Sequence, residues 1–131
     1  MADDDAEDCM LATEAFAESG AEGTFSCVSD GIELMQYLRD PHLAERGVPG
    51  LPNLILLDLN MPRKDGREAL IEIKSEPTLQ DIPVVILTTS EEQKDIAFTM
   101  KAGAKSFITK PETFDRWVEL MKSLTESLLE P

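Results

Sequence analysis

Two uninterrupted apolar runs restrict most strongly how this chain can fold. Residues 54–57 read Leu-Ile-Leu-Leu and lead into Asp58, and residues 83–87 read Pro-Val-Val-Ile-Leu and lead into Thr88. Short apolar runs bounded by turn residues are typical of strands that are buried on both faces. Such strands occur mainly in parallel sheets with helices on both sides. The sequence therefore predicts an α/β fold.

Capping residues and prolines indicate helices between the strands. Asp5 is a candidate N-cap for a first helix that ends near Gly20, and Asp30 with Glu33 forms a capping box for a second helix that stops before Pro41. Further helices are expected at residues 66–75, from a capping box of Ser90 and Gln93 to Gly103, and from Thr113 onward. Short strands are expected at residues 24–28 and 106–109. Residues 41–53 contain three prolines and two glycines and are expected to form a surface loop.

Polar residues follow the ends of the predicted strands. The carboxyl ends of parallel strands meet in one crevice, which would collect Asp58, Thr88 and Lys110, with Asp3 and Asp4 from before the first helix. Crowded carboxylates repel one another unless a cation neutralises them, and a hard divalent ion such as Mg²⁺ suits oxygen ligands. A lysine and a hydroxyl remain to hold an anion. This combination suits phosphoryl transfer to an aspartate.

The ordered motifs resemble the receiver domain of two-component response regulators. They are Asp3-Asp4, residues 54–62 (LILLDLNMP), Asp65-Gly66, Thr88 and residues 107–111 (FITKP). The resemblance covers nearly the whole chain and is closest to single-domain regulators of phytochrome-type sensor kinases. It implies one receiver domain over residues 1–131, with a flavodoxin-like, doubly wound parallel sheet of strand order 2-1-3-4-5.

The resemblance also implies a role for each residue of the acidic cluster. Asp58 is the phosphoacceptor, and Asp4 binds Mg²⁺ directly. Asp3 acts through water or orients the site, and Asn60 offers its backbone carbonyl to the metal. The domain is expected to assist its own phosphorylation and dephosphorylation, without being an enzyme in the usual sense.

The remaining motif residues are implied to report the phosphoryl group. Lys110 pairs with one phosphoryl oxygen, and the Thr88 hydroxyl moves to bond another. Phe107 takes the place of an aromatic side chain that changes rotamer when Thr88 moves, although plain packing explains it equally well. Pro111 is expected to follow a cis peptide bond.

Charge restricts the partners. The 131 residues contain 12 Lys+Arg and 26 Asp+Glu, a net charge of −14, which argues against nucleic acid and anionic membranes as direct partners. No apolar run approaches the roughly 20 residues of a membrane span. Cys9 and Cys27 lack metal-site spacing, which fits a reduced, cytoplasmic location. The expected partner is a sensor histidine kinase; the downstream protein is unknown, and a homodimer stays open.

Other function classes match less well. A P-loop is absent, because residues 103–106 read Gly-Ala-Lys-Ser without the second glycine. Residues 58–62 read Asp-Leu-Asn-Met-Pro and lack the second acid of haloacid-type phosphatases, and the lone His42 lies in a proline-flanked loop rather than on a helix. A degenerate receiver that binds partners without phosphorylation remains the alternative.

The amino terminus departs from the family pattern. A first strand of about five apolar residues should lead into the acidic pair and lie at the centre of the sheet. Here Met1 and Ala2 alone precede Asp3. The start is truncated, another chain fills the position, or the sheet closes up; we expect truncation, with the other elements at family positions. Closure would pair residues 24–28 with residues 54–58 and would move Asp3 and Asp4 away from Asp58.

Overall fold

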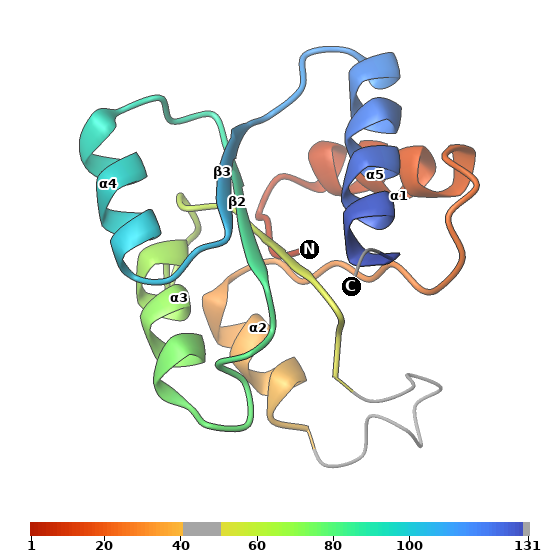
Figure 1. The fold of residues 1–131 in the computed structure, drawn as a ribbon. Coiled ribbons are helices and arrows are strands. Elements are labelled where there is room, and N and C mark those ends of the chain that lie inside the picture. Colours follow the sequence, from red (N-terminus) through yellow and green to blue (C-terminus); the bar gives the residue numbers. More distant parts are fainter. Residues whose placement is uncertain (41–50, 130–131) are drawn as a thin grey trace.

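Three strands form a parallel sheet in the order β1-β2-β3 in a computed structural model that describes residues 1–40 and 51–129. Figure 1 shows the helices on both faces of this sheet. In chain order the elements are α1 (Ala6–Glu18), α2 (Gly31–Leu38), β1 (Ile55–Leu57), α3 (Gly66–Ser75), β2 (Val84–Thr88), α4 (Gln93–Lys101), β3 (Ser106–Thr109) and α5 (Phe114–Leu129). The predicted α/β class is therefore confirmed.

The amino-terminal residues lie between β1 and the segment that leads into α2. Ala2 forms a parallel bridge to Leu57 on one side and to Val28 on the other. The Ala2 N–H donates to Leu56 O at 2.8 Å, and the Asp3 N–H donates to Val28 O at 3.0 Å. The sheet has not closed up, and the described strands and bridges reproduce the order 2-1-3-4-5. Of residues 24–28, which were predicted as a strand, Val28 alone takes part in a bridge.

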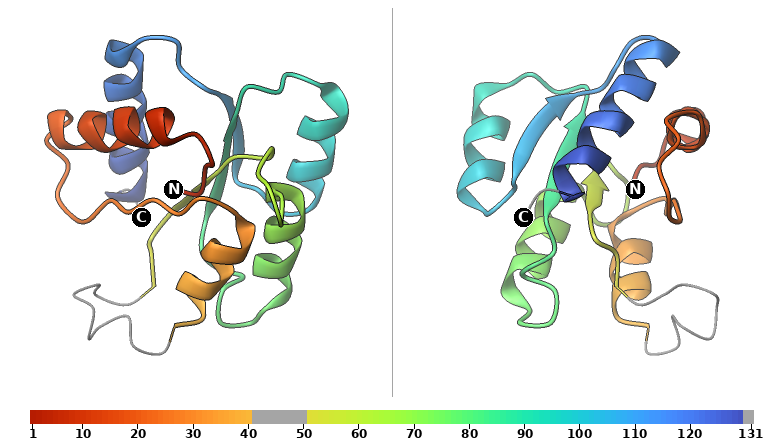
Figure 2. Two further views of the ribbon diagram at one scale, coloured as in Figure 1. Left: turned by 180° about the vertical axis from the view of Figure 1, so that it is seen from behind. Right: turned by 45° about the vertical axis from the view of Figure 1, so that its right-hand side comes forward.

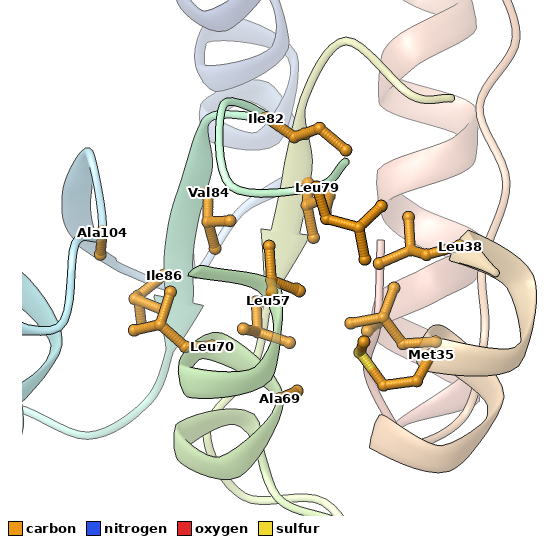
Figure 3. Close-up of a cluster of buried hydrophobic side chains, with 14 of the residues drawn as sticks. Met35, Leu38, Leu57, Ala69, Leu70, Leu79, Ile82, Val84, Ile86 and Ala104 are labelled. Carbon is orange, nitrogen blue, oxygen red and sulfur yellow. The ribbon is translucent and has the colours of Figure 1, made fainter. Parts of the chain in front are cut away.

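Two apolar cores result from the alternation of side chains along the strands. Ile55, Leu57, Val84 and Ile86 point toward α2 and α3, where Leu70 and others complete the core drawn in Figure 3. Leu56, Val85 and Leu87 point toward α1 and α5, where Trp117 is the largest buried side chain. Burial on both faces is what the continuous apolar runs predicted.

Most of the predicted caps are present. The side chains of Asp5, Asp30 and Asp65 accept hydrogen bonds from first-turn N–H groups of α1, α2 and α3. The capping box predicted at Ser90 is wrong: α4 begins at Gln93, two residues later than predicted, with Glu92 at the N-cap position and no side-chain cap. The Ser90 hydroxyl instead donates to Asp95 at 2.7 Å, a contact that local sequence does not predict. In the parts of the chain that the structure describes, no helix is both long and apolar enough to span a membrane.

Candidate functional site

Three carboxylates meet at the carboxyl ends of β1 and of the Met1–Asp3 segment. The Asp58 N–H donates to Ala2 O at 3.0 Å, so the backbone pairing that places Ala2 also places the two acids that follow it. Asp3, Asp4 and Asp58 each offer one oxygen, and these atoms lie within 4.8 Å of one another. Asp3 and Asp58 are buried, whereas Asp4 is exposed. The structure thus brings together the predicted carboxylates, with Asn60 exposed two residues beyond Asp58.

A glycine allows α3 to begin directly beside Asp58. A Cβ atom at Gly66 would lie 2.1 Å from the backbone oxygen of Asp58, a distance that no side chain tolerates. The Gly66 N–H donates to Leu59 O at 3.0 Å and fixes the turn after the strand. Local structure therefore explains the Asp65-Gly66 motif. Asp65 caps α3, and Gly66 permits the close approach of α3 to Asp58.

Lys110 is held within the same cluster. Its backbone N–H donates to Thr88 O at 2.8 Å, which places it at the end of β2. Its Nζ atom lies 2.7 Å from Asp3, 2.8 Å from Asp8 and 3.5 Å from Asp58, and its side chain is 9% exposed. The ammonium group is therefore paired more closely with Asp3 and Asp8 than with the predicted phosphoacceptor.

The electrostatics of the pocket follow from burial and from this pairing. Burial raises the pKa of Asp3 and the charge of Asp58 adds to the rise, while Lys110 and the Asp5 N–H partly offset it. Burial alone would lower the pKa of Lys110, but the ion pairs with Asp3 and Asp8 and the charge of Asp58 raise it. Lys110 therefore stays charged at neutral pH.

The donor set fits a hard divalent cation. The buried Asp3 Oδ2 atom lies 2.7 Å from the Lys110 ammonium and has no other polar partner among the described residues. Carboxylates crowded in a buried pocket repel one another, and a hard cation would neutralise the charge that Lys110 leaves unbalanced. One lysine charge against four nearby carboxylates leaves a net negative pocket.

The predicted reporter residues lie on neighbouring strands. Thr88 is fully buried at the end of β2, and its hydroxyl accepts a hydrogen bond of 3.4 Å from the Ser90 N–H. Phe107 on β3 is half-buried and packs against the core on the α2–α3 face. A change of rotamer at Phe107 stays a prediction.

The Lys110–Pro111 peptide bond is trans, as are all peptide bonds between described residues. This differs from the cis bond that the family resemblance implies for Pro111. The two isomers of a bond before proline differ by about 0.5–1 kcal/mol, so the motif itself does not fix the isomer.

Sequence reasoning missed two contributions to the pocket. Asp8 lies in the first turn of α1, where an acid is common at a helix start, and nothing in the sequence shows that it pairs with Lys110. Arg67 on α3 pairs with the buried Asp95 on α4 at 2.7 Å, and Ser90 donates to the same carboxylate. This second network ties α3 to α4 next to the site, and it also depends on contacts between distant parts of the chain.

Comparison with known proteins agrees with this geometry. The family model described as the response regulator receiver domain matches residues 1–122. Response regulator Rcp1 from Synechocystis sp. is 34% identical over 130 residues, which are 99% of this chain and 87% of that protein. The crystal structure of the phosphorylated cyanobacterial phytochrome response regulator RcpA is 41% identical with a TM-score of 0.85, over 98% of this chain and 91% of that one. The Mn²⁺-bound form of Rcp1 is 34% identical with a TM-score of 0.83, over the same shares of the two chains.

The fold and the site define a phosphoacceptor signalling domain rather than a conventional enzyme. The chain belongs to the response regulator receiver domain family of two-component systems, and close relatives are phytochrome response regulators. Receiver domains bind a divalent metal and have a sensor histidine kinase as a partner. None of these findings favours the degenerate alternative.

Proposed function

We propose that Asp58 accepts a phosphoryl group from a sensor histidine kinase. The observation that carries this proposal is the placement of the buried Asp58 carboxylate, with oxygens of Asp3 and Asp4 within 4.8 Å and the Lys110 ammonium at 3.5 Å. An Asp58 oxygen attacks phosphorus, the phosphorus–nitrogen bond of the donor breaks, and its electron pair returns to the donor histidine. The acceptor and both signs of charge are in place for such a transfer.

Lys110 and Thr88 hold the transferred group. The attacking Asp58 oxygen becomes the bridge to a phosphoryl group with three further oxygens and a charge of about −1.5 to −2, so negative charge increases where Lys110 already lies. Lys110 pairs with one oxygen, and the Thr88 hydroxyl, released from the Ser90 N–H, donates to another. Movement of Thr88 opens space beside Phe107 on β3, which passes the change to the surface formed by α4, β3 and α5. A local change of charge then biases a two-state surface.

Asp3, Asp4, Asp58 and the backbone carbonyl of Asn60 hold the metal, which we take to be Mg²⁺. When bound, it neutralises charge on the phosphoryl oxygens during transfer. The cluster of Asp3, Asp4 and Asp58 supports this assignment, because a hard cation neutralises carboxylate charge that Lys110 alone does not balance. The same pocket assists the later hydrolysis of the phosphoryl group.

The kinase is proposed to be of the phytochrome type. The support comes from relatives whose names describe phytochrome response regulators and which match this chain along nearly its whole length. Residues 1–131 would act as one cytoplasmic receiver that signals by protein contact. The net charge of −14 supports a protein partner rather than nucleic acid.

The test is phosphorylation with acetyl phosphate and Mg²⁺, followed by phosphotransfer from a panel of sensor kinases. Wild type should gain one acid-stable, base-labile phosphoryl group, and Asp58→Asn should gain none. Asp81→Asn is the matched control, because Asp81 is an exposed carboxylate before the opposite end of β2. Phosphoryl transfer that persists in Asp58→Asn would contradict the assignment of the acceptor. A wild type that binds its partners equally well with and without the phosphodonor, and stays unmodified, would support the degenerate alternative.

A further inference from the structure

The two cysteines of the chain lie side by side, although 18 positions of sequence separate them. The chain leaves the end of α1 and returns beside this helix to the amino terminus before it enters α2 (Figure 2). This return places Cys27, on the segment before α2, next to Cys9 of α1. The Cys27 Sγ atom lies 3.9 Å from the Cys9 carbonyl oxygen, and both residues are free thiols.

The hydrogen bonds of the two sulfur atoms keep the thiols within reach of each other. Cys9 donates to the Asp3 carbonyl at 3.9 Å, and Cys27 donates to the Cys9 carbonyl at the same distance. When Cys27 is a thiolate, the Cys9 thiol donates to it and lowers the pKa of Cys27, although burial opposes the shift. Thiols in such contact need little movement to form a disulfide, whose Cβ atoms lie about 3.5–4.5 Å apart.

The backbone beside each cysteine is already fixed by the fold. Cys9 lies within the hydrogen-bonded turns of α1. Val28, which follows Cys27, donates its N–H to Met1 O at 2.9 Å, and its carbonyl accepts from the Asp3 N–H at 3.0 Å. A bond between the two sulfur atoms would therefore join two positions that the fold already holds together.

Exposure separates the roles of the two thiols. Cys27 is exposed, whereas Cys9 is half-buried. A small oxidant in solution therefore reaches Cys27 first, and Cys9 lies behind it as the second thiol. Exposure of Cys27 also leaves a finished disulfide open to attack by reducing thiols. In reducing compartments, disulfides of this transient kind serve mainly in catalysis or redox sensing.

We propose that Cys9 and Cys27 form a reversible intramolecular disulfide by reaction with a low-molecular-weight disulfide such as oxidised glutathione. The Cys27 thiolate attacks one sulfur of the oxidant, whose disulfide bond breaks and releases one glutathione thiolate. The Cys9 thiol then gives up its proton to solvent and attacks the Cys27 sulfur, and the second glutathione thiolate leaves. In total the two cysteines lose two electrons and two protons, and one molecule of oxidised glutathione becomes two molecules of glutathione.

The disulfide ties α1 to the segment that precedes α2. It closes a loop between Cys9 and Cys27 and restricts the unfolded chain, which stabilises the folded state. The bond lies next to the acidic cluster, because the Cys9 thiol contacts the Asp3 carbonyl.

The test treats the whole chain with oxidised glutathione and counts free thiols by alkylation and mass spectrometry. Wild type should lose both thiols and the mass of two hydrogen atoms, and dithiothreitol should restore both thiols. Cys9→Ser should stop at a glutathione adduct on Cys27. The matched variant Cys27→Ser should react at least about tenfold more slowly than wild type, because its remaining thiol is half-buried. The melting temperature of oxidised wild type should lie at least about 5 °C above that of the reduced chain.

Four outcomes would overturn the proposal. The thiols of wild type stay unreacted; a glutathione adduct persists on wild type; the product is a disulfide-linked dimer; or oxidation leaves the melting temperature unchanged or lowers it. The third result assigns Cys27 to a contact between two chains, and the fourth shows that the bond distorts the fold. Because no phosphodonor is present, none of these outcomes depends on the proposed function of Asp58.

Discussion

The two ends of the Met1–Asp3 segment differ in how completely they are paired. At the carboxyl end, Ala2 and Asp3 are bonded to neighbours on both sides, and the acidic cluster follows at once. At the amino end, a groove separates residues 24–26 from residues 54–56. The four hydrogen bonds that place Asp3 beside Asp58 all involve Ala2 or one of its two chain neighbours. Pairing over the three residues of the Met1–Asp3 segment is therefore enough to place Asp3 beside Asp58.

Leucine-to-alanine substitutions in the filled core and beside the groove should lower the free energy of unfolding by different amounts. Leu70 of α3 is fully buried in the filled core, whereas Leu34 of α2 lines the groove. We expect Leu70→Ala to lower the free energy of unfolding by about 4 kcal/mol, because a closed cavity forms, and Leu34→Ala by about 2 kcal/mol, because it widens an existing groove. Urea denaturation measures both. Equal losses of unfolding free energy would contradict the difference in packing between the filled core and the groove.

Removal of the lysine charge tests the paired end. We expect Lys110→Ala to cost about 3 kcal/mol without Mg²⁺, because it leaves the buried carboxylates of Asp3 and Asp58 uncompensated. Mg²⁺ should bind the variant at least as tightly as wild type and should restore most of the stability. Thermal unfolding with and without Mg²⁺ measures both effects.

Lys105→Ala is the matched control for this substitution, because Lys105 is exposed and lies before β3, away from the cluster. It should change neither the stability nor the Mg²⁺ response. Weaker Mg²⁺ binding in Lys110→Ala would show that the lysine helps to shape the metal site instead of opposing it. That result would also contradict the argument that removal of a positive charge favours the binding of Mg²⁺.

Local sequence signals predicted the elements whose ends are set by residues close in the sequence. The bounds of α3 and β3 agree with residues 66–75 and 106–109, because a cap, a glycine and a proline delimit the first and turn residues the second. The segment 24–28 failed as a strand because its central neighbour offers pairing at Val28 and not before it. A strand of that kind depends on the partner beside it, which its own sequence does not contain.

The site shows the same division. Thr88 ends β2, Asp58 and Lys110 directly follow β1 and β3, and all three were predictable from the rule that strand ends converge. The pairing of Asp8 with Lys110 spans 102 positions of sequence, and the exchange of Ser90 from a cap to Asp95 depends on where α4 packs. The pairing of Asp8 was missed and the cap at Ser90 was wrong, because in both cases the partner of the side chain lies outside its local sequence or depends on helix packing.

Substitution of Gly66 tests whether phosphorylation depends on the close approach of α3 to Asp58. Gly66→Ala places a Cβ 2.1 Å from the Asp58 backbone oxygen, so the strand end must move. We expect a loss of about 2 kcal/mol in the free energy of unfolding and of most phosphorylation by acetyl phosphate. Gly20→Ala is the control: nothing lies within 4 Å, and its φ of 78° should cost about 1 kcal/mol with phosphorylation intact. Full phosphorylation of Gly66→Ala would show that Asp58 tolerates displacement.

The smallest expected effect concerns the ion pair beside the site and depends on pH. The Ser90 hydroxyl and then Arg67 hold the pKa of Asp95 below its ordinary value of 3.8. A carboxylate with a lowered pKa in the folded state stabilises the protein above its unfolded pKa, and this contribution is lost as the pH falls through the folded value. Asp95→Asn should therefore cost about 1 kcal/mol at pH 7 and progressively less below pH 3.8. Urea denaturation across this range, with Asp81→Asn as the control, measures the difference. A cost that stays constant with pH would mean that packing around Asp95, and not its charge, ties α3 to α4.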